Sequence, residues 1–185
     1  MAGRQADVLV AAARAGDHEA WRRLYELHAS RLVAWLRSLP HTDAASSADD
    51  VASEAWLTAA SKIGELRGGD DDFAPWLFTI ARNHASNSRR KALRRATDPL
   101  DVQESADAFG AVPDGTDAVD GGDRTRRLLA LLSPREAEVV ACIDVVGLDV
   151  AATAQVLGMR PTAVRVARHR ALGRLRSHLG DAGLS

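Results

Sequence analysis

One internal stretch limits what this chain can fold into more than any other feature of its sequence. The 28 residues from Ala96 to Asp123 contain eight Asp or Glu residues, no Lys or Arg, and several Pro and Gly residues. Such a segment cannot bury enough apolar surface to offset the entropy lost on ordering it. We therefore predict a flexible acidic linker at residues 97–123, which divides the chain of 185 residues into two small domains, 1–96 and 124–185.

Both flanking parts carry helical patterns. Apolar residues between positions 21 and 39 recur at the spacing of one helix face, with Asp17 as the N-cap and Pro40 beyond the end. A second helix is expected over about residues 48–63, and a third from near Phe73 through the basic stretch that ends at Arg95. No segment alternates apolar and polar residues as a half-buried strand does, so we predict an all-α fold.

The C-terminal part has the helix start and stop signals of a helix-turn-helix. Ser133 to Glu136 reads as a capping box with Pro134 at the first helical position. Asp149 can cap a short helix that ends at Gly158. A basic last helix opens at Pro161, and we expect its apolar residues, from Val164 to Leu179, to face inward.

In a helix-turn-helix the start of the second helix enters the major groove of DNA. Arginine suits this position because its fork can contact guanine or bridge phosphates. The residues expected to reach DNA are Arg160, Thr162, Arg165, Arg168 and His169.

The formal net charge of −1 hides two basic surfaces. Residues 81–95 hold six cations and no acid, and residues 160–176 hold six arginines and no acid. Either block alone is explained about equally well as a solvated helix face. Two such blocks joined by an anionic tether indicate a nucleic-acid-binding protein.

Several other classes of protein are excluded. Cys142 is the only cysteine, so no internal disulfide or thiolate-rich zinc site can form. The six histidines lack metal-binding spacing, and we find no phosphate loop, nucleophile elbow or pair of catalytic carboxylates. We therefore expect no metal, no cofactor and no enzymatic activity. We find neither a signal peptide nor an apolar run of membrane-spanning length, which predicts a cytoplasmic protein with no membrane insertion.

The order of these segments resembles an extracytoplasmic function (ECF) sigma factor, the small two-domain specificity subunit of bacterial RNA polymerase. "SADDVASEAWLTA" is similar to the family's core-binding helix, and "FAPWLFTIARNHASNSRRK" to its promoter-melting and −10 segment. The block from "LSPREAEVV" to "RALGRLR" is similar to its −35 domain.

The resemblance implies roles for particular residues. The loop 65–73 matches the loop that captures a base flipped out of the −10 element. The residues matching the core-polymerase contact are Asp50, Ser53, Glu54 and Leu57. The residues matching the −10 and melting surface are Trp76, Asn83, Ser86, Asn87, Arg89, Arg90 and Lys91. The five helix-turn-helix residues named above match the −35 contact.

The expected partners are core RNA polymerase, through its β′ clamp helices and β subunit, and promoter DNA in duplex and single-stranded form. Many members of the family also bind an anti-sigma factor. We predict an alternative sigma factor that directs promoter recognition and opening. The alternative is a helix-turn-helix regulator that binds DNA without being a polymerase subunit; a helical adaptor with incidental basic patches is a third class, disfavoured by the helix-turn-helix.

Overall fold

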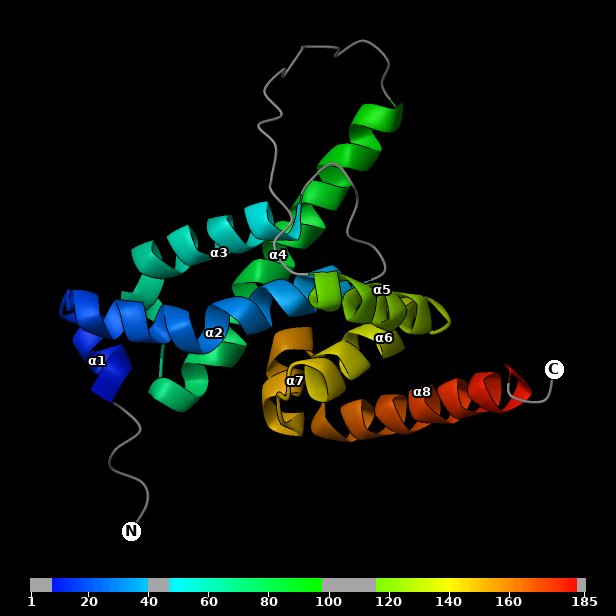
Figure 1. Ribbon diagram of the computed structural model, residues 1–185. Coiled ribbons are helices and arrows are strands. Elements are labelled where there is room, and N and C mark those ends of the chain that lie inside the picture. Colours follow the sequence, from blue (N-terminus) through cyan, green and yellow to red (C-terminus); the bar gives the residue numbers. More distant parts are fainter. Residues whose placement is uncertain (1–7, 40–46, 98–115, 183–185) are drawn as a thin grey trace.

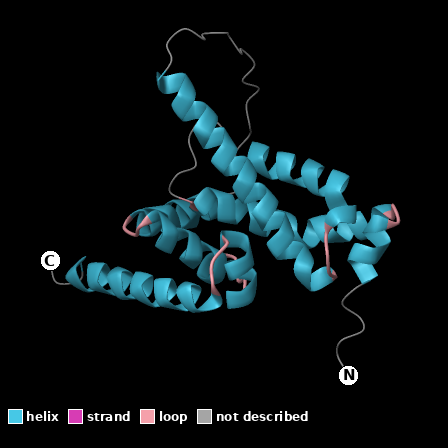
Figure 2. Ribbon diagram, turned by 180° about the vertical axis from the view of Figure 1, so that it is seen from behind, coloured by secondary structure: helices cyan, strands magenta, loops and turns pink. Residues whose placement is uncertain are grey.

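The computed structural model describes residues 8–39, 47–97 and 116–182, and all regular elements in these ranges are helical (Figures 1 and 2). The predicted all-α fold is confirmed. In order, the elements are α1 (Val8–Arg14), α2 (His18–Ser38), α3 (Ala48–Lys62), the 3-10 turn η1 (Ile63–Glu65), α4 (Asp70–Thr97), α5 (Thr116–Ala130), α6 (Pro134–Val140), the π-helical turn η2 (Ala141–Val145), α7 (Val150–Leu157) and α8 (Pro161–Ala182).

The expected acidic linker coincides only partly with the described chain. Residues 98–115 lie outside the described residues. Residues 116–123, the last part of the expected linker, form the first half of α5. The helical part of the C-terminal half therefore begins earlier than the sequence pattern indicates.

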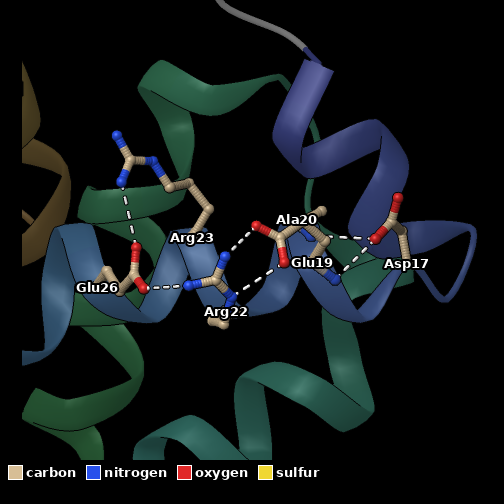
Figure 3. A network of polar contacts seen from close by, with 6 residues as sticks. All are labelled: Asp17, Glu19, Ala20, Arg22, Arg23 and Glu26. Carbon is tan, nitrogen blue, oxygen red and sulfur yellow. Dashed lines mark hydrogen bonds and ion pairs between the residues drawn. The ribbon is translucent and has the colours of Figure 1, made fainter.

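Local capping residues define the start of α2, as the sequence predicts. Asp17 accepts hydrogen bonds from the backbone N of Glu19 at 2.8 Å and of Ala20 at 3.2 Å (Figure 3). Further along the same helix, Arg22 bridges Glu19 and Glu26 on the solvent side. The helix thus begins where a side chain satisfies its free N–H groups.

Helix α4 begins three residues before the expected position near Phe73. The Asp72 carboxylate accepts a hydrogen bond from the backbone N of Gly69 at 3.1 Å, and three acids occupy the first turn. Acids are favourable there because they face free N–H groups and the positive end of the helix dipole. Pro75 consequently lies inside the helix, where its ring removes one hydrogen bond.

The C-terminal half has the predicted helix-turn-helix. Glu136 accepts hydrogen bonds from the backbone N and hydroxyl of Ser133, at 3.2 and 2.6 Å. Asp149 caps α7 through the backbone N of Ala152 at 2.7 Å, and Gly158 ends it with φ 60°. One expectation is wrong: Leu179 is 52% exposed, because the last turns of α8 extend beyond the helices that cover its start (Figure 1).

The N-terminal half packs around an aromatic cluster centred on Phe73. Phe73, at the start of α4, is fully buried. Its ring centroid lies 6.4 Å from Trp21, 5.4 Å from His28, 6.0 Å from Trp56 and 6.0 Å from Trp76. This cluster joins α2, α3 and the start of α4, the helix that carries the expected −10 residues.

The two halves of the chain are in contact. Helix α4 lies against α7, and α2 lies against η2 and α5. Arg82 donates to Glu138 through Nε at 3.1 Å and Nη2 at 3.2 Å. Arg31 donates through Nε and Nη2 to the carbonyl oxygen of Val146, at 3.1 and 2.8 Å. Polar contacts thus tie the helix-turn-helix to the N-terminal bundle.

Cys142 lies at this junction. It is fully buried in η2, the turn that packs on α2. Burial raises the pKa of its thiol to about 12. The Trp35 side chain of α2 lowers this pKa, but by less than burial raises it. Trp35 is also fully buried. A single thiol therefore sits where the two halves meet.

None of the described helices is both long and apolar enough to cross a membrane.

Candidate nucleic-acid interface

Helix α4 arranges most of the expected −10 residues along one face. With 3.6 residues per turn, Asn83, Asn87 and Arg90 fall within the same third of the helix surface, and Ser86 lies beside them. Asn83, Asn87 and Arg90 are exposed, and Ser86 is partly exposed. Arg90 Nη2 donates to the Asn87 amide oxygen at 2.9 Å. This face therefore presents two amides that can read base edges and, one turn later, a cation that can hold a phosphate.

The remaining cations of this set are distributed around the helix. Lys91 is exposed at the edge of the amide face. Arg89 is exposed two turns after Arg82, on the side of α4 that carries the ion pair with Glu138. Arg89 therefore does not share the face of Asn83 and Asn87.

Trp76 lies two turns before Asn83 on the same face. It is partly buried, with one side of its ring against Phe73 at a centroid distance of 6.0 Å. A partly exposed indole on a rigid support can stack on an unpaired base. The expected base-capture loop 65–73 is irregular only at residues 66–69, because Glu65 ends η1 and residues 70–73 form the first turn of α4. Trp76 lies one turn after this segment and joins it to the amide face.

A groove of about 450 Å³ lies between α3 and α4. Its lining residues are Glu54, His84, Asn87, Ser88, Arg90, Lys91 and Arg94. The lining of this groove is predominantly polar and carries three cations, Arg90, Lys91 and Arg94, which suits the binding of an anionic nucleic-acid strand. Among the described residues, no cluster of His, Cys, Asp or Glu suits a metal ion.

His84 is a residue of this site that the sequence did not suggest. Its Nε2 lies 2.9 Å from the Thr58 hydroxyl, and its Nδ1 lies 3.1 Å from Oε2 of Glu54. Both partners belong to α3, so His84 ties the expected core-binding helix to α4 beside Asn83. Only the tertiary contact identifies it, because a lone histidine in a basic helix has no distinctive spacing.

The four expected core-binding residues form one exposed row on α3. Asp50, Ser53, Glu54 and Leu57 follow the pattern i, i+3, i+4, i+7, so they share a helix face. Leu57 is 73% exposed, an unusual environment for leucine on a helix whose opposite side is anchored by Val51 and buried alanines. The Ser53 hydroxyl donates to the Asp49 carbonyl at 2.9 Å, so it is bonded within its own helix.

The start of α8 and Arg160, the residue before it, present four of the five expected DNA-contacting residues to solvent. Arg160, Thr162, Arg165 and His169 are exposed. Arg168 instead donates to Asp144 of η2, through Nε at 3.0 Å and Nη2 at 2.5 Å. Four of the five side chains are thus exposed, whereas the fifth, Arg168, is held by an ion pair within the helix-turn-helix.

Comparison with known proteins places both halves. Residues 24–95 match sigma-70 region 2, and residues 123–175 match sigma-70 region 4. The ECF RNA polymerase sigma factor SigD of Mycobacterium tuberculosis is 35% identical over 187 residues, which cover 99% of this chain and 88% of SigD.

Solved structures share the fold. CnrH, solved in complex with the cytosolic domain of CnrY, superposes with a TM-score of 0.69 at 22% identity, covering 94% of this chain and 96% of CnrH. The sigma factor RpoE of Bartonella quintana, solved with the anti-sigma factor NepR, gives a TM-score of 0.58 at 23% identity, covering 84% of this chain and 98% of RpoE.

Proposed function

Because this chain belongs to the ECF family of RNA polymerase sigma factors, we propose that it brings core polymerase to its promoters through three separate surfaces. It is an alternative sigma factor. Residues 1–96 bind core polymerase and melt the promoter, and residues 124–185 read the −35 element. Sigma factors are non-enzymatic initiation factors, so this chain supplies binding energy and the polymerase supplies the chemistry.

The first surface is the exposed row on α3, which binds the clamp helices of the β′ subunit. Leu57, the last residue of the row, is its main apolar contact, because an apolar side chain that is 73% exposed gains most from burial in a partner. Asp50 and Glu54 precede it on the same face and fix the orientation by polar contacts. The hydrogen bond from His84 holds the Glu54 carboxylate in place.

The second surface is the amide face of α4, and it carries the proposal. A helix that only required solubility would not need Asn83 and Asn87 in line with Arg90 and beside a supported tryptophan. This arrangement provides stacking, base-edge hydrogen bonds and phosphate contacts on one rigid element, as the capture of a melted strand requires. Lys91 adds charge at the edge of this face, and Arg89 adds charge on the side of α4 that carries Arg82.

The third surface is the start of α8. Arg160, Thr162, Arg165 and His169 are free to enter the major groove, whereas Arg168 must first leave Asp144. Elements named for positions −35 and −10 lie about 25 base pairs apart, or about 85 Å along B-form DNA at ~3.4 Å per step. Since α8 follows directly after α7, which lies against α4, both elements can be read at once only after the two halves separate.

An anti-sigma factor is the remaining proposed partner. The relative RpoE has been solved bound to one, and the fold of this chain matches RpoE over most of its length. A protein that binds both halves in their contacting arrangement would hold the DNA-reading surfaces apart from promoter and polymerase. The chain would then be released when that partner is removed.

Assembly with core polymerase tests this function. We expect the chain to co-migrate with bacterial core enzyme in size-exclusion chromatography, and Leu57→Asp to abolish co-migration because it places a charge in an apolar contact. Leu179→Asp is the matched control, since Leu179 is also exposed, at 52%, and lies outside the α3 row. Failure of the wild-type chain to bind core enzyme, with specific binding to duplex DNA, would instead favour a free-standing regulator.

A further inference from the structure

Helix α1 holds the segment that joins α3 to α4 through one arginine. Arg14, the last residue of α1, donates Nε to the carbonyl oxygen of Ile63 at 3.3 Å and Nη2 to that of Gly68 at 3.1 Å. Nη2 also donates to the carbonyl oxygen of Leu66. A single guanidinium therefore fixes this segment at three points within six residues.

The Leu66 and Gly68 carbonyl oxygens lie in irregular backbone between η1 and α4. Such carbonyls have no helical partner, and the rigid fork of an arginine can satisfy several of them together. Gly68 adopts φ +120°, a conformation that other residues rarely take, so the backbone turns sharply at this point. The turn and the three contacts together define one conformation.

The other end of α1 is held by the same segment in return. The carboxylate of Asp70 accepts hydrogen bonds from the backbone N of Leu9 at 3.2 Å and of Val10 at 2.7 Å. Asp70 thus caps α1 from 60 positions away in the chain. Arg14 and Asp70 thus hold α1 and residues 63–70 against each other at both ends of α1. We call this pair of contacts the clasp.

We propose that Arg14 is a positioning residue for base selection in the −10 element, acting through the conformation of residues 63–70. This inference rests on the proposed function, together with the role that the family resemblance implies for residues 65–73, which is to receive a nucleobase flipped out of the duplex. Arg14 does not touch the base. It sets where the loop backbone and the neighbouring Trp76 present their contacts, and discrimination between bases depends on such placement.

The packing of α1 does not depend on the Arg14 side chain. Val10 is fully buried and Ala13 is 2% exposed, and these two residues anchor the helix in the N-terminal core. The indole N–H of Trp21 donates to the Ala13 carbonyl at 3.2 Å and holds the end of α1. Replacing the guanidinium should therefore release the loop without unfolding α1.

The first test needs no polymerase. In Arg14→Gln we expect amide hydrogen exchange at residues 66–70 to accelerate by roughly fivefold or more, because the loop loses hydrogen bonds that hold it closed. Arg23→Gln is the matched control, because Arg23 is an exposed arginine of α2 that pairs with Glu26 of the same helix (Figure 3). Unchanged exchange in Arg14→Gln would overturn the clasp.

The second test measures base selection. Transcripts are sequenced from a promoter library made with core polymerase and either wild-type chain, Arg14→Gln, Arg14→Lys or Arg23→Gln. We expect Arg14→Gln to lose roughly fivefold or more of its base preference at one −10 position, with the −35 preference unchanged. Arg14→Lys should recover part of it, since an ammonium group can still donate to these carbonyls.

The outcomes separate the two proposals. A uniform fall in transcription with the same base preferences would make Arg14 a purely structural residue and refute its positioning role. Wild-type chain that yields no transcripts would instead contradict the proposed function, while hydrogen exchange would still report on the clasp.

Discussion

Separation of the two halves can be followed at a single atom, the thiol of Cys142. The perturbation is Glu138→Gln, which removes the carboxylate that Arg82 holds with two hydrogen bonds across the junction. The side chains of Arg82 and Glu138 are only 27% and 23% exposed, so solvent replaces this contact incompletely. We therefore take the loss as about 1.5 kcal/mol, the lower end for hydrogen bonds between charged groups.

A change of about 1.5 kcal/mol increases the population of separated chains by roughly tenfold. While the halves are in contact, the thiol is buried and its pKa of about 12 leaves almost no reactive thiolate. Alkylation must then wait for separation, and its rate follows the separated fraction. We expect Glu138→Gln to be labelled by a maleimide roughly tenfold faster than wild type at neutral pH.

The control is Glu26→Gln, the same chemical change at a residue whose ion pairs with Arg22 and Arg23 lie on the exposed side of α2. Its labelling rate should equal that of wild type. Urea denaturation of all three proteins identifies any contribution from global unfolding. Equal labelling of Glu138→Gln and wild type would refute the reasoning, because the junction would then not limit access to Cys142.

Two further predictions concern single side chains. Asp144→Asn should free Arg168 from its ion pair and change the sequence preference or affinity at the −35 element; a duplex-binding library that gives the wild-type profile would show that Arg168 takes no part in recognition. Burial, with a smaller contribution from Arg31, lowers the pKa of His28 from 6.5 to about 4. Between pH 6.5 and pH 4 the unfolded chain therefore binds a proton at His28 that the folded chain does not bind. Stability should therefore fall as pH falls from 7 to 5, measured by the urea midpoint, and His28→Gln should remove that part of the fall; an identical pH dependence in the variant would exclude His28 as its source.

Much of the fold could be predicted because helix boundaries are decided locally. Asp17, Ser133, Asp149 and Pro161 each act within one turn of the helix that they begin, so their types and spacing are sufficient. The exposed row on α3 and the amide face of α4 follow from the same periodicity.

The sequence could not indicate features that depend on distant partners. Asp70 belongs to α4 but caps α1, so the residues near the start of α1 do not indicate its cap. Arg168 has the same local pattern as Arg165, yet a carboxylate in another element holds it. The ion pair of Arg82 with Glu138 requires the two halves to meet, and no pattern within either half encodes that contact.

The central claim is that this chain gives core polymerase its promoter specificity. The most direct measurement is run-off transcription by bacterial core polymerase from a promoter library, with and without the chain, followed by sequencing of the transcripts. The account predicts transcripts that depend on the chain and share a −35 and a −10 motif at fixed spacing. Transcripts that are the same with and without the chain, although it binds the core enzyme, would contradict it.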